Sequence, residues 1–444
     1  MTEYIEHEIE LPLDTCYDIP EYKLVDYCSV FLAICPETGR WLVLSDPNEC
    51  KALACLAEHL SIEDSINVCG EESVFSVVTK IESRRFYSTE VRTLENFETM
   101  QIYLTNSCNL RCPHCYMNSG SPIHGELTTA EVLSLCSEFK KIGGLYVTLT
   151  GGEVTMRKDL KDLLKGIAEV GLRIHILSSG TQWNKDILNL IPNLPIERIQ
   201  ISLDGYDEAS NALIRGKGNF QRALRTIDVL VKSGVYTVVV ATPWYKELKL
   251  HKQDYINFAK SLVSKYADFS NFCFNFSYEL LEGRELNGKD VLSNNQDYLR
   301  IMRDISEQVY PGSQVSSFAE DHRGGLIFNN CGYGRINVAA DGEIFPCSRI
   351  SDVCSCGNIR NDAFSEIIMR LKILRKLSQV DNLSPCSACE LKYICGGGCR
   401  VDHFPGLRSA NYCNIPTSSS RACDSKVKSY FYDLMIASQE LLNE

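Results

Sequence analysis

Strands and helices alternate regularly through the middle of this 444-residue chain. Six short apolar runs are typical of strands, and the stretches between them have the apolar spacing of helices. The predicted strands are residues 100–104, 145–150, 173–177, 198–203, 236–241 and 271–277, and the predicted helices are 128–142, 159–170, 185–191, 219–233 and 253–266. This alternation predicts an α/β fold with a parallel sheet, and right-handed crossovers curl such a sheet toward a barrel.

A three-cysteine motif follows the first predicted strand. Cys108, Cys112 and Cys115 have the spacing C-x3-C-x2-C, and the aromatic residue Tyr116 comes directly after them. Three thiolates can hold three irons of a 4Fe–4S cluster and leave the fourth iron open for another ligand. Zinc or an unrelated cluster is the alternative, although a structural zinc site usually has four ligands and often uses C-x2-C pairs.

Together with Gly151-Gly152-Glu153, this motif resembles that of the radical S-adenosylmethionine (SAM) superfamily. The resemblance implies a partial (β/α)6 barrel, similar to a TIM barrel, over residues 93–310. It implies that the open iron chelates SAM, and that reduction of the cluster yields a 5′-deoxyadenosyl radical. In parallel barrels the catalytic groups gather at the carboxyl ends of the strands, and each of these motifs lies at such an end.

The resemblance also assigns residues at the first three strand ends to SAM. It implies that Gly151, Gly152 and Glu153 contact the methionine amino group, because glycines let the backbone approach a ligand closely. It places Tyr116 beside the adenine. The third strand ends near Ser179, where the family often has asparagine, and the hydroxyl of Ser179 is the group left to contact the ribose.

The fourth predicted strand ends in Ser202-Leu203-Asp204-Gly205, and Arg215 follows on what we expect to be a loop. This pattern is similar to that of the radical SAM subgroup that acts on peptides and proteins. It implies that Ser202, Asp204 and Arg215 lie near the ribose or the carboxylate of SAM, which a guanidinium can bind bidentately. An aspartate that begins a turn before Gly205 is the alternative for Asp204.

The last part of the chain, residues 325–444, has a second cysteine pattern. A C-x2-C-x5-C-x3-C run begins at Cys386, and an Asp-Gly hairpin signal precedes Cys347. The pattern resembles the SPASM domain, a cysteine-rich extension with two auxiliary 4Fe–4S clusters, and zinc is the alternative. For the first cluster the resemblance implies the ligands Cys331, Cys347 and Cys399, and its fourth position is either open or filled by Cys354 or Cys356. For the second cluster it implies Cys386, Cys389, Cys395 and Cys423, with Cys413 as the alternative to Cys423.

Residues 1–92 predict a separate small unit. Strands are expected near 29–34 and 40–44, followed by helices that begin after Asp46 and after Ser61 and by a third helix from about 73 to 85. This order resembles the winged-helix leader-peptide recognition domain that is fused to many peptide-modifying enzymes. An ordinary structural extension explains the order equally well.

Composition limits the partners and the location. The net charge of −12 argues against nucleic acid as a partner, and neither a signal peptide nor a membrane-spanning apolar run is found. We therefore expect a cytoplasmic protein with no membrane contact. In that compartment the 21 cysteines are expected to be metal ligands or free thiols rather than disulfides.

These features predict a radical SAM peptide maturase with SAM and three 4Fe–4S clusters. It would abstract hydrogen from a residue of a ribosomally made precursor peptide with a leader sequence, giving a thioether or carbon–carbon crosslink or an epimerised residue. An external electron donor of the flavodoxin or ferredoxin type would reduce it. The alternatives are a maturase of a protein such as a sulfatase or a quinohemoprotein subunit, and a non-catalytic iron–sulfur or zinc scaffold.

Overall fold

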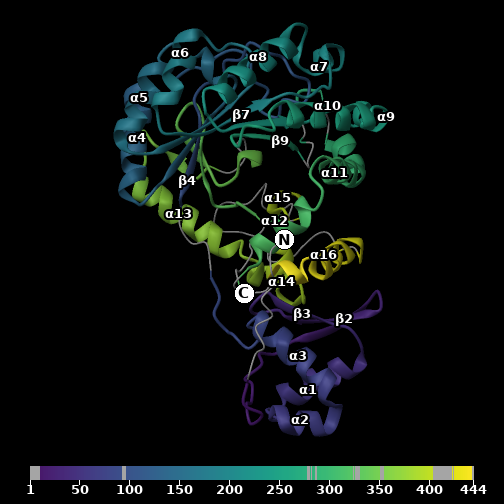
Figure 1. Cartoon of the computed structure of the whole chain (residues 1–444). Helices are drawn as coiled ribbons and strands as arrows, with labels where there is room; N and C mark the ends of the chain where they lie inside the picture. The colour runs from purple at the N-terminus through teal and green to yellow at the C-terminus, as the bar shows by residue number, and fades with distance from the viewer. Residues whose placement is uncertain are drawn as a thin grey trace.

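The computed structural model has three parts that follow one another along the chain (Figure 1). It describes residues 11–92, 97–277, 281, 283–285, 288–323, 325, 331–350, 355–403, 423 and 425–442. Cys354 and Cys413, two alternatives for cluster ligands, lie outside these ranges. The barrel and the N-terminal unit lie at opposite ends of the molecule, and helix α16 (Ser425–Ala437) lies between them.

The N-terminal unit is a three-stranded antiparallel sheet followed by three helices. The strands are β1 (Lys23–Tyr27), β2 (Val30–Cys35) and β3 (Arg40–Leu44), and the helices are α1 (Pro47–Ala57), α2 (Ile62–Cys69) and α3 (Glu71–Ser83). Asp46 caps α1 by accepting hydrogen bonds from two backbone N–H groups, and Ser61 caps α2. Both predicted strands and all three predicted helices are present, and the sequence reasoning missed β1, which is largely exposed.

Six parallel strands form the partial barrel, and all six lie within two residues of their predicted bounds. They are β4 (Thr99–Tyr103), β5 (Tyr146–Thr150), β6 (Arg173–Ser178), β7 (Ile196–Ser202), β8 (Thr237–Ala241) and β9 (Phe272–Phe276), paired in chain order. The five predicted helices are α4 (Thr129–Lys141), α5 (Leu160–Val170), α6 (Lys185–Leu190), α8 (Asn219–Lys232) and α10 (Lys252–Lys265). They cover the outer face of the sheet, so the inner face is left to line the site.

Four further helices of this part were not predicted. They are α7 (Glu208–Arg215), α9 (Tyr245–Leu250), α11 (Gly288–Val309) and α12 (Ser313–Asp321). Helix α7 has only eight residues, and Asp207 begins it by accepting a hydrogen bond from the Ser210 N–H. Arg215 is therefore the last residue of a helix, and the expectation that it lies on a loop is wrong.

The C-terminal part extends the barrel sheet. Strand β10 (Ile336–Val338) pairs in parallel with β4, and β11 (Glu343–Phe345) and β12 (Gly357–Asn358) continue outward, so the sheet has nine strands. Helix α13 (Phe364–Leu377) packs its apolar residues into the same core as the barrel. The short helices α14 (Lys392–Cys395) and α15 (Arg400–His403) follow. The barrel and this part share one hydrophobic core.

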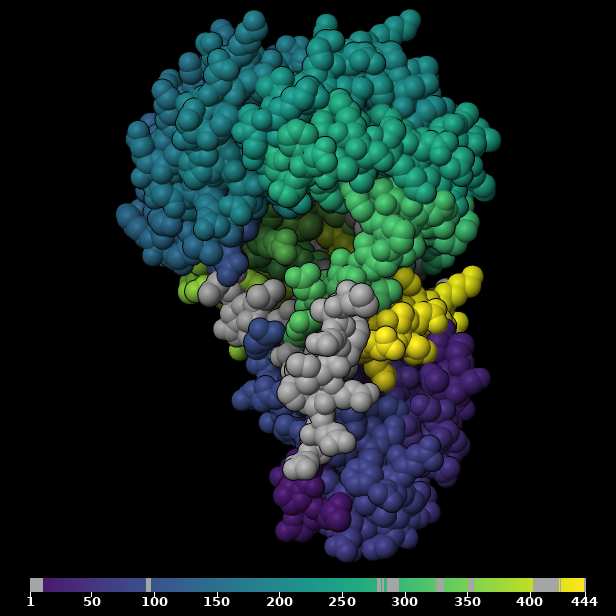
Figure 2. Space-filling model, viewed as in Figure 1, coloured from purple at the N-terminus to yellow at the C-terminus, as the bar shows by residue number. Residues whose placement is uncertain are grey.

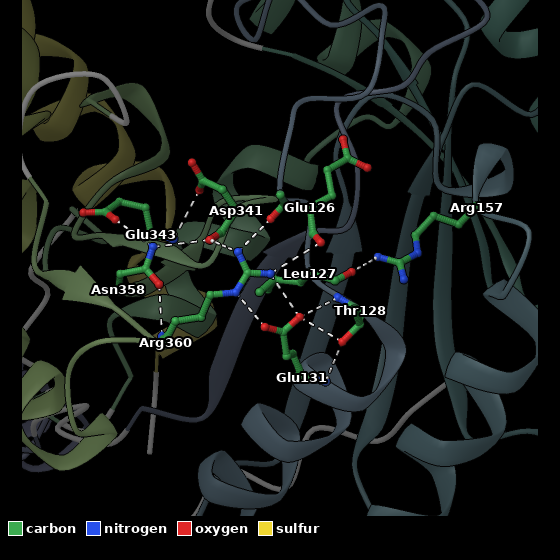
Figure 3. A network of polar contacts seen from close by, with 10 residues as sticks. Glu126, Leu127, Thr128, Glu131, Arg157, Asp341, Glu343, Asn358 and Arg360 are labelled. Atoms are coloured by element: carbon green, nitrogen blue, oxygen red, sulfur yellow. Dashed lines mark hydrogen bonds and ion pairs between the residues drawn. The ribbon is translucent and has the colours of Figure 1, made fainter.

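Arg360 joins the C-terminal part to the first barrel helix (Figure 3). Its Nε lies 2.6 Å from Glu131 Oε1, and its Nη1 donates to the Gly125 carbonyl at 2.8 Å. Glu131 also completes a capping box with Thr128 at the start of α4, as the sequence suggests. The Arg360 hydrogen bond, with those from Thr128, lowers the pKa of the Glu131 carboxyl to about 2.

Glu131 should therefore stabilise the folded chain in a pH-dependent way. Its folded pKa is below its unfolded value, so the stabilisation is complete above about pH 4.5 and is lost as the pH falls toward 2. We expect Glu131→Gln to lower the urea unfolding midpoint, followed by circular dichroism, clearly at about pH 6 and much less at about pH 3. Glu138→Gln, on the same helix, removes a surface ion pair with Lys141 and should change the midpoint little. An equal effect of Glu131→Gln at both pH values would contradict the assignment.

Candidate SAM and iron–sulfur site

The three cysteines of the first motif lie on the loop after β4, at the carboxyl end of the barrel. The Cys108 N–H donates to the Gly120 carbonyl at 3.0 Å, and the Cys115 N–H donates to the Cys112 carbonyl at 3.2 Å. The Leu110 N–H points at Cys108 Sγ, 3.4 Å away. Burial raises the pKa of the Cys108 and Cys112 thiols, so their thiolates need nearby positive charge, which iron would supply.

Gly151 and Gly152 let the end of β5 pass directly against this loop. The Gly152 N–H donates to the Thr105 carbonyl and the Glu153 N–H to the Ser107 carbonyl, both at 2.8 Å. A Cβ atom on Gly152 would lie 2.2 Å from the Ser107 oxygen. A Cβ on Gly151, whose φ is +134°, would lie 2.4 Å from the Thr105 oxygen. Both glycines are thus required by the close approach of two backbone segments at the site.

The Glu153 carboxylate, which is 1% exposed, ties the end of β5 to the end of β6. One oxygen accepts hydrogen bonds from the Ser178 hydroxyl at 2.7 Å and the Thr155 hydroxyl at 2.8 Å. The other accepts from the Ser179 N–H at 2.7 Å and the Ser179 hydroxyl at 2.6 Å. The side chain predicted to bind the SAM amino group is therefore already occupied within the protein, and the backbone carbonyls of this segment are the acceptors that remain for an ammonium group.

Asp204 is completely buried and connects several elements at the end of β7. Its Oδ2 lies 2.6 Å from Arg215 Nε and 3.5 Å from His114 Nε2, and its Oδ1 accepts the Thr242 N–H at 2.8 Å. Because burial lowers the pKa of the His114 imidazole, Arg215 is the main positive partner of the carboxylate. Asp204 therefore serves as a buried ion-pair partner, and the alternative of a turn-initiating aspartate is wrong. Ser202 lies half-buried at the last position of the same strand.

The polar atoms at this end of the barrel fit a bound polar ligand. Among the buried side-chain atoms of the described residues at this end of the barrel, Asn109 Oδ1 and His114 Nδ1 have no hydrogen-bond partner, whereas Arg215 Nε is paired with Asp204 Oδ2. Buried polar groups of a native protein are normally paired, so an unpaired set indicates a missing partner. The guanidinium of Arg215 can donate hydrogen bonds to a carboxylate, and the amino-acid end of SAM carries such a group.

Two tyrosines lie between the first cysteine loop and the C-terminal part. The hydroxyls of Tyr103 and Tyr116 are 3.3 Å apart, and Gln101 Nε2 donates to the Tyr103 hydroxyl at 2.7 Å. Both rings and Ser348 line a cavity of about 360 Å³, which explains why Tyr116 is 44% exposed although protein surrounds it. Burial raises the pKa of both phenols. Sequence reasoning missed Tyr103, which the alternation of inward residues along β4 could have indicated.

Cys331, Cys347 and Cys399 line one cavity of about 740 Å³ between the barrel and the C-terminal part. The space-filling view shows the molecule hollowed between these two parts (Figure 2). A hydrogen bond from Cys399 lowers the pKa of the Cys331 thiol to about 6, and Arg349 Nη1 donates to Cys399 Sγ at 3.1 Å. Cys356, by contrast, is buried in the shared core.

The other group of C-terminal cysteines also lies close together. Burial raises the pKa of the Cys395 thiol to about 12, and the charges of Cys423, Cys386 and Cys389 raise it further. Cys423 is exposed, and it raises the pKa of Cys386 as well. These four cysteines therefore lie near enough to affect one another's thiol pKa, and their assignment to a second auxiliary cluster stays a prediction.

This arrangement defines a radical SAM enzyme: a partial parallel barrel with a three-cysteine loop at the carboxyl ends of its strands. Residues 102–256 match the model of the radical SAM superfamily, and residues 330–390 match the SPASM iron–sulfur cluster-binding domain. Residues 102–256 therefore form a radical SAM domain, and residues 330–390 form a SPASM domain. The alternative of a non-catalytic scaffold is therefore wrong.

Curated relatives and solved structures resemble most of the chain. An AdoMet-dependent heme synthase of Methanosarcina barkeri is 28% identical over 70% of this chain and 94% of its own length. The sporulation killing factor maturation protein SkfB of Bacillus subtilis is 27% identical over 65% of this chain and 69% of its own. The structure of Streptococcus suis SuiB bound to S-adenosylmethionine shares the fold, with 16% identity, a TM-score of 0.51, and coverage of 90% of this chain and 98% of that one.

Gly152→Ala should disable the first site without unfolding the barrel. The new Cβ would meet the Ser107 carbonyl and move the loop that holds Cys108. Because misplacing reacting groups by about 1 Å can cost roughly a hundredfold in rate, we expect a loss of that order in SAM cleavage, measured as 5′-deoxyadenosine formed after dithionite is added.

Gly143→Ala is the matched control, because Gly143 has a φ of +92° but nothing within 4 Å of the added Cβ. It should lower stability by about 1 kcal/mol and leave SAM cleavage unchanged. Equal cleavage by the two variants would contradict the role assigned to Gly152.

Proposed function

We propose that this radical SAM enzyme modifies a ribosomally made precursor peptide. It would abstract a hydrogen atom from one residue of the peptide, and a thioether link, a carbon–carbon link or an epimerised residue would result. The observation that carries the proposal is the combination of a SAM site and a SPASM part that share one core and enclose a cavity of about 740 Å³. A maturation protein, SkfB, is among the relatives.

The residues around the first site have separate proposed roles. Cys108, Cys112 and Cys115 would hold the cluster that binds SAM. When bound, the reduced cluster and SAM would together supply a 5′-deoxyadenosyl radical. Arg215, oriented by Asp204, would bind the SAM carboxylate, and the backbone carbonyls near Gly152 would accept the amino group. Three side chains would contact the rest of SAM: Ser179 and Ser202 the ribose, and Tyr116 the adenine.

The C-terminal cysteines would hold two auxiliary clusters. Cys331, Cys347 and Cys399 would leave one iron of the first cluster open to the cavity that they line. Cys386, Cys389, Cys395 and Cys423 would complete the second cluster, and the mutual effects on their thiol pKa values support this grouping. The cysteine-bound irons would accept the surplus electron that remains after a crosslink forms.

The wider setting is also proposed. An external flavodoxin or ferredoxin would deliver the reducing electron, and the protein would work in the cytoplasm. Among the described residues, no helix is both long enough and apolar enough to cross a membrane.

Tetrapyrrole chemistry is the second candidate, because several relatives are heme synthases, among them the Methanosarcina barkeri enzyme. That relative is matched along 94% of its own length but along only 70% of this chain, so this chain contains additional sequence. The N-terminal unit, which has its own core, lies outside both matched domains. The other alternative, a maturase of a folded protein, would use the same chemistry on a larger substrate.

Anaerobic reconstitution tests the proposal. Three 4Fe–4S clusters predict about twelve irons per chain, and dithionite should then release 5′-deoxyadenosine from SAM. Replacing Cys108, Cys112 and Cys115 by alanine should remove about four irons and abolish this cleavage. Replacing Cys331, Cys347 and Cys399 should also remove about four irons but leave cleavage without peptide in place.

Bound zinc with few irons, or cleavage that survives loss of the first three cysteines, would contradict the assignment. A mass change in a candidate precursor peptide would support peptide modification. Conversion of an added tetrapyrrole to heme, with every peptide unchanged, would overturn it in favour of the second candidate.

A further inference from the structure

The cavity of about 740 Å³ between the barrel and the C-terminal part is rich in positive charge. Four arginines line it, Arg198, Arg335, Arg349 and Arg375, against a single acidic residue, Glu98. The chain as a whole has the opposite balance, with 57 acidic residues and 45 lysines and arginines. A concave region lined by one sign of charge concentrates ligands of the other sign, so this cavity favours an anionic ligand.

Two of the four arginines have partners within the protein. Arg349 Nη1 donates to Cys399 Sγ at 3.1 Å, and Arg375 Cζ lies 5.7 Å from the centroid of the Phe97 ring. A thiolate at Cys399 would carry negative charge, which the Arg349 guanidinium offsets. These two arginines are therefore explained by contacts inside the chain.

Arg198 and Arg335 are exposed to the cavity and have no such partners. Within the part of the chain that the structure describes, no carboxylate lies within ion-pair distance of either guanidinium. Glu197, the acid next to Arg198, lies 3.4 Å from Arg173 instead. Burial and the charge of Arg198 lower the pKa of the His175 imidazole to about 4, so this ring is neutral at neutral pH. The two guanidiniums are thus the cationic groups that a ligand in the cavity can bind.

The two arginines come from different parts of the fold. Arg198 faces inward from the first half of β7, because its neighbour Ile199 packs into the core on the other face. Arg335 directly precedes β10, in the C-terminal part. Strands β10 and β7 are four places apart in the sheet, which is about 19 Å along it before curvature. This spacing suits two carboxylates of one extended segment better than a single small anion.

Strand β7 relates the arginines to the SAM end of the barrel. Ser202, the last residue of the strand, is four residues beyond Arg198, so about 13 Å of strand separates them. An extended peptide covers that distance in about four residues. The cavity wall beside Arg198 includes the neutral polar side chains of Gln101, Thr148 and Gln200, which can hydrogen bond to a peptide backbone.

We propose that Arg198 and Arg335 bind aspartate or glutamate side chains of the substrate, and that an acidic residue lies within about four positions of the modified one. A guanidinium binds a carboxylate bidentately, in a fork geometry that an ammonium group lacks. This inference rests on the proposed function, because it treats the ligand as part of the peptide that the SAM site modifies. A tetrapyrrole with carboxylate side chains presents the same chemistry, and the experiment separates the two sources.

The probe is a hexapeptide of alternating glutamate and alanine, acetylated and amidated at its ends so that only its side chains are charged. Its binding to the reconstituted full-length enzyme with SAM is followed by anaerobic isothermal titration calorimetry. We expect binding that weakens as salt is added, and roughly tenfold weaker binding of the same peptide with glutamine in place of glutamate. Arg198→Gln and Arg335→Gln should each weaken binding of the glutamate peptide roughly tenfold, because each leaves a carboxylate without its charged partner.

Arg222→Gln is the matched control, because Arg222 is exposed on α8, on the outer face of the barrel, and its loss changes the net charge equally. It should bind the glutamate peptide as the unaltered chain does. Arg198→Glu combined with Arg335→Glu should reverse the preference, so that a peptide with lysine in place of glutamate binds more tightly than the glutamate peptide. Circular dichroism and iron content should be unchanged in all of these variants, which verifies that they are folded.

Three results would overturn the inference: equal binding of the glutamate and glutamine peptides, unchanged binding by Arg198→Gln and Arg335→Gln, or an equal loss in Arg222→Gln. Uroporphyrin, a tetrapyrrole with carboxylate side chains, is titrated in parallel. If uroporphyrin binds and the glutamate peptide does not, an acidic peptide is wrong as the ligand.

The proposed function fails separately. If the enzyme forms no 5′-deoxyadenosine, the radical chemistry is wrong whatever the cavity binds. If it forms 5′-deoxyadenosine but binds the glutamate and glutamine peptides equally, only the selection of acidic residues is wrong.

Discussion

The ion pair between Asp204 and Arg215 is the interaction on which the geometry of the site depends. A carboxylate that is completely buried must be paired, because an isolated charge in the interior of a protein is very unfavourable. The partners of the carboxylate come from three places in the chain: Arg215 at the end of α7, His114 in the cysteine loop and Thr242 after β8. The Tyr255 hydroxyl, in α10, donates to the backbone carbonyl of the same residue. Losing this carboxylate would release the guanidinium and the loop together.

Glu153 has a similar role on the other side of the site. Both carboxylates follow parallel strands, and the parallel arrangement brings their positions to the same edge of the sheet. The family motif at these positions is therefore explained largely by structural requirements: the glycines allow backbone contact, and the acids hold the loops that carry the ligands. This rigidity suits a radical reaction, because reactive groups must be held in place and away from water.

The extended sheet connects the two halves of the proposed chemistry. Because β10 pairs with β4, the cysteine loop after β4 lies beside the hairpin that carries Cys347. Tyr103 and Tyr116 lie between them, and the charges of Cys115 and Cys347 both affect the pKa of Tyr116. A substrate between the first site and the auxiliary cysteines would thus be enclosed by two parts of one continuous sheet rather than by two loosely linked domains.

The sequence by itself determined the barrel and the cysteine groups, because strand alternation, capping residues and motif spacing are local properties of the chain. It placed the six strands to within two residues and both ends of the five predicted helices to within one. Only the tertiary structure decided that Arg215 ends a helix, that Glu153 is occupied by Ser178 and Ser179, and that β3 is covered by the C-terminal part. These facts depend on contacts between residues that are far apart in the chain, and no local pattern reports which distant groups will satisfy a buried charge or cover a sheet edge.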